Sequence, residues 1–162
     1  MNHAASFAID LADERATAAL AAEVAAHAHG GDVIALSGPL GAGKTSFARG
    51  FIEARMGAPR LDQEVPSPTF MLVETYQPAQ GPTIWHFDLY RLESPDDAYE
   101  LGIEDAFADG IALIEWPERL GGLLPRDHLG IALASGATET ARIATITPSP
   151  AWAGRIAGLK RG

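Results

Sequence analysis

The chain has 162 residues, of which 47% are hydrophobic, and a formal net charge of −9. This length is typical of one domain and allows a sheet to be buried between helices, so we expect a single domain over residues 1–162. The absence of cysteine excludes disulfide frameworks, thiolate zinc sites and cysteine nucleophiles. The acidic charge and the presence of only two lysines, Lys44 and Lys160, argue against direct nucleic-acid binding, which relies on clustered basic residues.

The N-terminal residues show no basic segment followed by an apolar core, and no run of about 18 apolar residues occurs. We therefore expect a cytoplasmic protein without a membrane segment.

Helix-like and strand-like segments alternate along the chain, which predicts an α/β fold. In chain order they are a helix over 13–29 closed by Gly30-Gly31, a strand over 32–37, a helix over 44–55, an exposed loop over 56–68, strands over 70–76 and 83–90, a helix from Pro95 toward Leu101, a strand over 110–115, a hairpin of 129–134 with 141–146, and a short helix from about Pro150.

The loop between the first predicted strand and the second helix carries the strongest motif, Gly38-Pro-Leu-Gly-Ala-Gly-Lys44-Thr45. It matches the P-loop pattern, and the strand before it and the helix after it give the expected context. Glycines let backbone N–H groups turn toward a phosphate, Lys44 supplies a charge for the β- and γ-phosphates, and Thr45 offers a hydroxyl to magnesium. The sequence therefore predicts ATP and magnesium as cofactors. The residues expected to bind the nucleotide are Gly38, Pro39, Leu40, Gly41, Ala42, Gly43, Lys44, Thr45, Ser46 and Thr69.

A P-loop site also needs an acid near the magnesium shell, commonly at the end of a buried strand. Glu115 ends the apolar run over 111–114, and Asp88 lies on the same face of its strand as His86. We assign Glu115, with Thr45, to the magnesium ion and Asp88 to positioning water or metal. The alternatives are an exposed acid on an edge strand for Asp88 and a charge before a helix at Trp116-Pro117 for Glu115.

Two other features are less specific. Ser67-Pro68-Thr69 could place a hydroxyl near the γ-phosphate, although such a tripeptide is also typical of a turn that enters a strand. The acidic side chains Glu93, Asp96, Asp97, Glu100, Glu104 and Asp105 are typical of a solvated helix face. His86 alone is compatible with a core, a surface or a functional role.

The P-loop, Ser67-Pro-Thr-Phe70, His86-Phe-Asp-Leu-Tyr-Arg91-Leu92 and Ile114-Glu-Trp-Pro117 occur in an order that resembles the bacterial TsaE (YjeE) family. These proteins are ATPases required for threonylcarbamoyladenosine modification of tRNA. The resemblance runs from about Leu11 to Pro125, with Pro39 standing where the family usually carries aspartate.

The resemblance implies a P-loop NTPase-like three-layer sandwich with a mixed central sheet flanked by helices, a C-terminal β-hairpin and a short helix. It implies that Lys44, Asp88 and Glu115 support magnesium-dependent ATP hydrolysis, slow alone, and that 67–69 is a switch-like segment. It also implies action on a TsaD-TsaB-type heterodimer rather than on tRNA, and adenine contacts within 13–17.

A small-molecule or nucleotide kinase is the alternative, since it would use the same loop. Such an enzyme usually needs several arginines around the transferred phosphoryl group, and only Arg91 lies between Thr69 and Glu115. A guanine-specific GTPase is excluded, because the Asn-Lys-x-Asp signature cannot occur where the only lysines are Lys44 and Lys160.

Overall fold

The protein is described here by a computed structural model that covers residues 5–57 and 72–160. Its elements are, in chain order, β1 (Phe7–Leu11), α1 (Glu14–Ala26), β2 (Val33–Ser37), α2 (Lys44–Met56), β3 (Val73–Tyr76), β4 (Ile84–Asp88), the 3₁₀ helix η1 (Pro95–Leu101), α3 (Ile103–Asp109), β5 (Ile111–Glu115), η2 (Pro117–Leu123), β6 (Leu129–Ser135), β7 (Arg142–Thr147), α4 (Pro150–Ala153) and η3 (Ala157–Lys160).

The strands form one seven-stranded sheet in the order β1-β7-β6-β2-β5-β4-β3. The central pairs β2–β5, β2–β6 and β4–β5 are parallel, whereas β1–β7, β6–β7 and β3–β4 are antiparallel. The predicted mixed sheet and the C-terminal hairpin are therefore confirmed. β2 lies centrally, so the loop that follows it emerges in the middle of the sheet's carboxyl edge.

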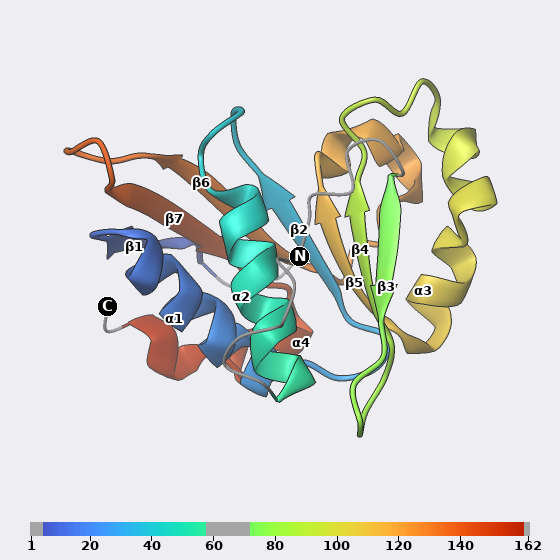
Figure 1. Ribbon diagram of the computed structural model, residues 1–162, viewed down its shortest axis with the longest axis horizontal. Helices are drawn as coiled ribbons and strands as arrows, with labels where there is room; N and C mark the ends of the chain where they lie inside the picture. Colours follow the sequence, from blue (N-terminus) through green and yellow to red (C-terminus); the bar gives the residue numbers. More distant parts are fainter. Residues whose placement is uncertain (1–4, 58–71, 161–162) are drawn as a thin grey trace.

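Helices cover both faces of the sheet, which confirms the three-layer arrangement. Figure 1 shows α1 and α2 side by side over one part of the sheet and α3 beside β3 to β5. Successive side chains of a strand point to opposite faces of the sheet, so each strand contributes to two separate cores. Ile34 packs in the core with α1, α2 and Trp152, while Val33 packs in the core with η1, α3 and η2.

The predicted elements did not include the edge strand β1 or the helix α3, and η2 appeared only in the alternative of a helix at Trp116-Pro117. β1 is only five residues long and pairs with β7, from the far end of the described chain. Such a strand depends on a distant partner rather than on a local pattern. α3 follows η1 after Gly102, whose φ of 86° lets the chain turn between the two helices.

The end of α1 also differs from the prediction, because the helix stops at Ala26 rather than at Gly30-Gly31. Arginines satisfy carbonyls in the last turn of α1 and just after it: Arg55 donates to the carbonyls of Ala25 and Ala28, and Arg155 donates to that of His27 at 3.0 Å. The guanidinium of Arg155 also pairs with the carboxylate of Asp32 at 2.7 Å. Side chains from other elements thus end this helix.

Within the described residues, no helix is both long and apolar enough to cross a membrane.

Candidate functional site

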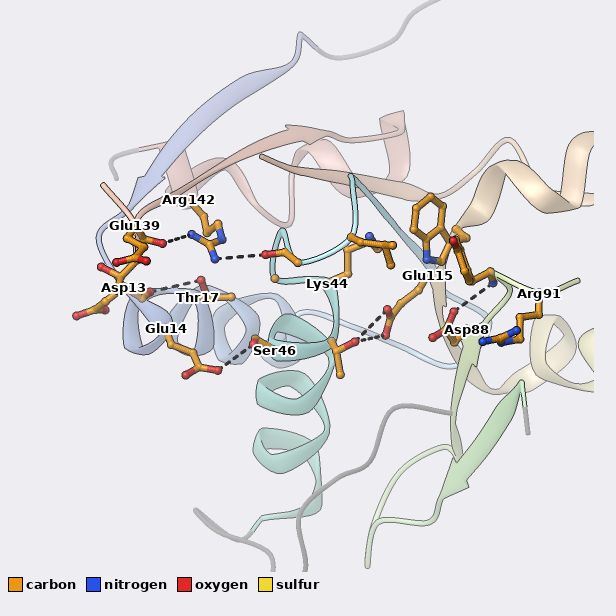
Figure 2. A pocket seen from close by; sticks show the side chains of 17 residues that line it. Asp13, Glu14, Thr17, Lys44, Ser46, Asp88, Arg91, Glu115, Glu139 and Arg142 are labelled. Carbon is orange, nitrogen blue, oxygen red and sulfur yellow. Dashed lines mark hydrogen bonds between the residues drawn. The ribbon is translucent and has the colours of Figure 1, made fainter. Parts of the chain in front are cut away.

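A pocket of about 760 Å³ lies at the carboxyl ends of the parallel strands. Ligands of open α/β sheets bind at this edge, where the loops after neighbouring strands diverge. Its volume is in the range of small-molecule sites. Figure 2 shows its side chains converging from α1, the loop before α2, the ends of β4 and β5, and the start of β7.

The loop over 38–43 keeps its shape through glycines with positive φ, at Gly38 (134°), Gly41 (79°) and Gly43 (109°). A side chain at Gly38 would collide with the backbone carbonyl of Leu133 on β6, so the close approach also requires glycine there. Gly43 leads directly into α2, whose N-terminal N–H groups therefore face the pocket.

Lys44 is folded back onto its own loop. Its Nζ donates to the carbonyls of Gly38 at 2.5 Å and Pro39 at 2.9 Å, and only 5% of the residue is exposed. Burial lowers the pKa of this ammonium below 10.5, while the nearby carboxylates of Glu115, Asp88 and Glu118 act in the opposite direction. The lysine is thus a desolvated charge beside the pocket.

An aromatic ring covers the same ammonium, since Lys44 Nζ lies 4.2 Å from the centre of the Trp116 ring. Trp116 adopts a left-handed conformation (φ 62°, ψ 53°), which costs a non-glycine residue about 1–2 kcal/mol. Tyr90 packs against it, with ring centres 5.0 Å apart. Such strain at a pocket is typical of a functional site.

The two strand-end acids lie side by side, because Asp88 on β4 is in register with Glu115 on β5. The Thr45 hydroxyl donates to Oε1 and Oε2 of Glu115 at 3.1 and 3.2 Å. Asp88 accepts the backbone N–H of Tyr90 at 3.2 Å. Both acids are almost fully buried, at 2% exposed for Glu115 and 4% for Asp88, and β4 is an inner strand. The alternative of an exposed edge-strand acid is therefore wrong for Asp88.

The opposite end of the pocket is formed by the start of α1 and the loop before β7. Asp13 caps α1 by accepting the N–H of Ala16 at 2.9 Å, and Ser46 donates to Glu14 at 2.9 Å. Thr17 also lines this end. The segment expected to contact adenine therefore faces the pocket, although the contact itself stays a prediction.

The structure brings most of the predicted site residues together. Leu40, Gly41, Gly43, Lys44, Thr45, Ser46, Asp88 and Glu115 all line the pocket. Gly38, Pro39 and Ala42 shape the loop behind it. Thr69 and the segment 67–69 lie outside the described residues. What these residues bind stays a prediction.

Sequence reasoning missed Arg142, the first residue of β7. Its guanidinium donates to the carbonyls of Ala141 at 2.8 Å, Glu139 at 2.9 Å and Gly41 at 3.3 Å. These bonds connect the β6–β7 hairpin to the loop over 38–43. The pocket therefore has two arginines, Arg91 and Arg142, and they lie at opposite ends of it in Figure 2. The hairpin that carries Arg142 was predicted, but its position beside β2, which brings Arg142 to the loop, depends on the pairing of β6 with a distant strand.

Comparison with known proteins identifies the family. The family model described as "Threonylcarbamoyl adenosine biosynthesis protein TsaE" matches residues 11–143. The chain belongs to the TsaE family. The tRNA threonylcarbamoyladenosine biosynthesis protein TsaE of Rickettsia conorii is 44% identical over 114 residues, or 70% of this chain, and that of Bacillus subtilis is 40% identical over 118 residues, or 72%.

The fold is shared as well. The crystal structure of Bacillus subtilis YdiB superposes with a TM-score of 0.75 at 27% identity, covering 99% of this chain and 97% of that one. The chain thus has the P-loop NTPase-like fold of the TsaE family. It spans 63% of the length of the Rickettsia conorii relative and 70% of the Bacillus subtilis relative.

The two loop glycines Gly38 and Gly41 form a matched pair for testing the loop. Gly41→Ala should cost about 1–2 kcal/mol of unfolding free energy, because it places a side chain at positive φ in open space. Gly38→Ala should cost about 3 kcal/mol or more, because the new methyl group also meets the Leu133 carbonyl. Urea unfolding of both variants measures the difference, and equal losses would contradict the close approach.

Proposed function

We propose that the chain binds ATP with magnesium in this pocket and hydrolyses it, and that this turnover serves threonylcarbamoyladenosine modification of tRNA through a protein partner. The observation that carries the proposal is the pairing of Thr45, on the loop that matches the P-loop pattern, with the strand-end carboxylate of Glu115. Membership of the TsaE family supports the link to tRNA modification.

Magnesium fits the residues that are present. The Thr45 hydroxyl and both oxygens of Glu115 are hard oxygen donors gathered at one point, as this ion prefers. Within the described ranges no cluster of three or more His, Asp or Glu could hold a metal alone. That agrees with an ion that takes its remaining ligands from water and phosphate.

The charge of the pocket gives a second reason for a cation. Its lining carries five carboxylates, at Asp13, Glu14, Asp88, Glu115 and Glu139, against three basic side chains, at Lys44, Arg91 and Arg142. A bare triphosphate would meet more negative than positive charge here. A divalent ion that neutralises phosphate oxygens and polarises the γ-phosphorus removes this repulsion.

The roles of the protein groups follow from their positions. The backbone N–H groups at the start of α2 receive phosphate oxygens, and Lys44 moves from the carbonyls of Gly38 and Pro39 to the anion. Asp88 is near enough to Glu115 to orient a water molecule, since the two residues are in register. Its carboxylate would accept the proton of that water as the oxygen attacks the γ-phosphorus. The bond from this phosphorus to the oxygen that bridges it to the β-phosphate would break, and ADP and inorganic phosphate would leave the pocket.

Action on a TsaD-TsaB-type heterodimer is proposed from the resemblance, and the surface is compatible with it. The acidic side chains over 93–105, which were expected to form a solvated face, are exposed on η1, on α3 and, for Glu93, just before η1. Such a face repels tRNA phosphates and suits a protein partner with basic groups. The expectation that the chain does not bind nucleic acid directly stays a prediction.

Lys44→Ala should reduce the affinity for magnesium-ATP by about 100-fold or more, because a charge-assisted contact to phosphate is lost. In the wild type, the affinity for magnesium-ATP should also fall as the pH rises through the pKa of Lys44, because the neutral amine attracts phosphate less. Burial lowers this pKa from 10.5, so the loss should begin at a lower pH than for an ordinary lysine. Calorimetry at several pH values measures both effects, with the exposed Arg126→Ala as a control of equal charge change. Unchanged affinity in Lys44→Ala would exclude this site.

Asp88→Asn should lower the hydrolysis rate by about 100-fold while ATP affinity changes by no more than a few-fold. Asparagine keeps an oxygen that can accept the Tyr90 N–H, so the loop after β4 is preserved. Single-turnover hydrolysis and calorimetry separate the two quantities. Equal losses of binding and hydrolysis would indicate a structural role for Asp88.

The wild-type chain should hydrolyse ATP slowly and accelerate when a TsaD-TsaB-type heterodimer is added, with a nucleotide-dependent complex on a sizing column. Lys44→Ala is the matched control, because its hydrolysis should not respond to the heterodimer. Absence of both complex and acceleration contradicts the partner assignment. Transfer of phosphate to an added small molecule or nucleotide would favour a kinase instead.

A further inference from the structure

A histidine stands directly behind the carboxylate of Glu115. His86 on β4 is fully buried, and its Nε2 lies 2.7 Å from Oε2 of Glu115. Nδ1 has no hydrogen-bond partner among the residues that the structure describes. Among the described residues, Glu115 is therefore the hydrogen-bond partner of the His86 ring.

This contact completes a chain of three side chains from three elements. Glu115 on β5 accepts the Thr45 hydroxyl from α2 on one side and meets the His86 ring from β4 on the other. A carboxylate touched by a single partner can rotate about its last bond. Contacts from two sides fix both the position of the oxygens and the plane of the group.

Stability alone does not explain a buried pair of this kind. The strand neighbours of His86 are the apolar Leu113 opposite it on β5, Ile84 two residues before it on the same face, and the half-buried Glu74 opposite it on the edge strand β3. Replacing a buried ionisable pair with apolar residues is often neutral or stabilising, because the desolvation of both groups is avoided. The pair therefore indicates a role at the pocket.

We propose that His86 is a positioning residue that orients the Glu115 carboxylate for the metal ion, so that metal affinity depends on His86 while nucleotide affinity without metal does not. This inference rests on the proposed function, because it concerns the magnesium ion expected between Thr45 and Glu115.

The test uses Mn²⁺ as the probe, with free Mn²⁺ measured by electron paramagnetic resonance at saturating non-hydrolysable ATP analogue. His86→Gln and His86→Asn form a matched pair, since both carry an amide but only glutamine can place its N–H₂ near the position of Nε2. His86→Asn should weaken Mn²⁺ binding by about 10- to 100-fold, as is typical when the partner of a metal ligand is lost. His86→Gln should stay within a few-fold of the wild type.

Binding of the analogue in EDTA should remain within about twofold in both variants, which a general disturbance of the pocket would not allow. His128→Asn is the control for loss of a histidine. His128 directly precedes β6, at the amino ends of the parallel strands and thus away from the pocket, and it contacts the carbonyl of Pro125. It should leave Mn²⁺ affinity unchanged.

Two results would overturn the inference: unchanged Mn²⁺ affinity in His86→Asn, or an equal loss of analogue affinity with and without metal. Circular dichroism checks that each variant is folded. The Mn²⁺ affinities of His86→Gln and His86→Asn are compared directly, because both variants keep a polar side chain at this buried position. Failure of the wild-type chain to bind the analogue at all contradicts the proposed function itself. The two failures are therefore distinguishable.

Discussion

The parallel pairing of β2 with β5 is the constraint on which the site depends. It sets Leu36 opposite Glu115, and the N–H of Trp116 then donates to the carbonyl of Leu36 at 3.3 Å. β2 ends one residue later, and the loop that begins at Gly38 turns back over this edge. β4 continues the same register and brings Asp88 beside Glu115. Residues far apart in the sequence therefore meet because three strands end together.

Much of this arrangement could be predicted from local patterns. The glycine spacing before Lys44 fixes a loop between a strand and a helix, and the apolar run before Glu115 marks a buried strand. Alternation placed His86 and Asp88 on one face of their strand. The contact of His86 with Glu115 could not be predicted in this way, because it depends on which strand lies next to β4. The place of Arg142 at the loop and the strand β1 were missed for the same reason, since each depends on a pairing between distant strands, β6 with β2 and β1 with β7.

The site also departs from the rules that the rest of the chain obeys. Elsewhere apolar side chains fill two cores, and acidic side chains are exposed or half-buried. Around the pocket, by contrast, an ammonium and two carboxylates are buried, and Trp116 holds a strained backbone conformation. Such departures cost free energy, and the apolar cores around them offset that cost. Their concentration in one place separates the functional part of the fold from its scaffold.

The hydrogen bond from Thr140 to the carbonyl of Ala12 joins the loop before β7 to the turn before α1. During synthesis the N-terminal part of the chain leaves the ribosome first. One side of the pocket is therefore made before β7, because it consists of the loop over 38–43, Asp88 and Glu115. β1 pairs with β7 only when β7 is made, and Arg142 then also reaches the loop carbonyl of Gly41. The wall at that end of the pocket therefore closes only after β7 has been made, which ties the completion of the binding site to the synthesis of the β6–β7 hairpin.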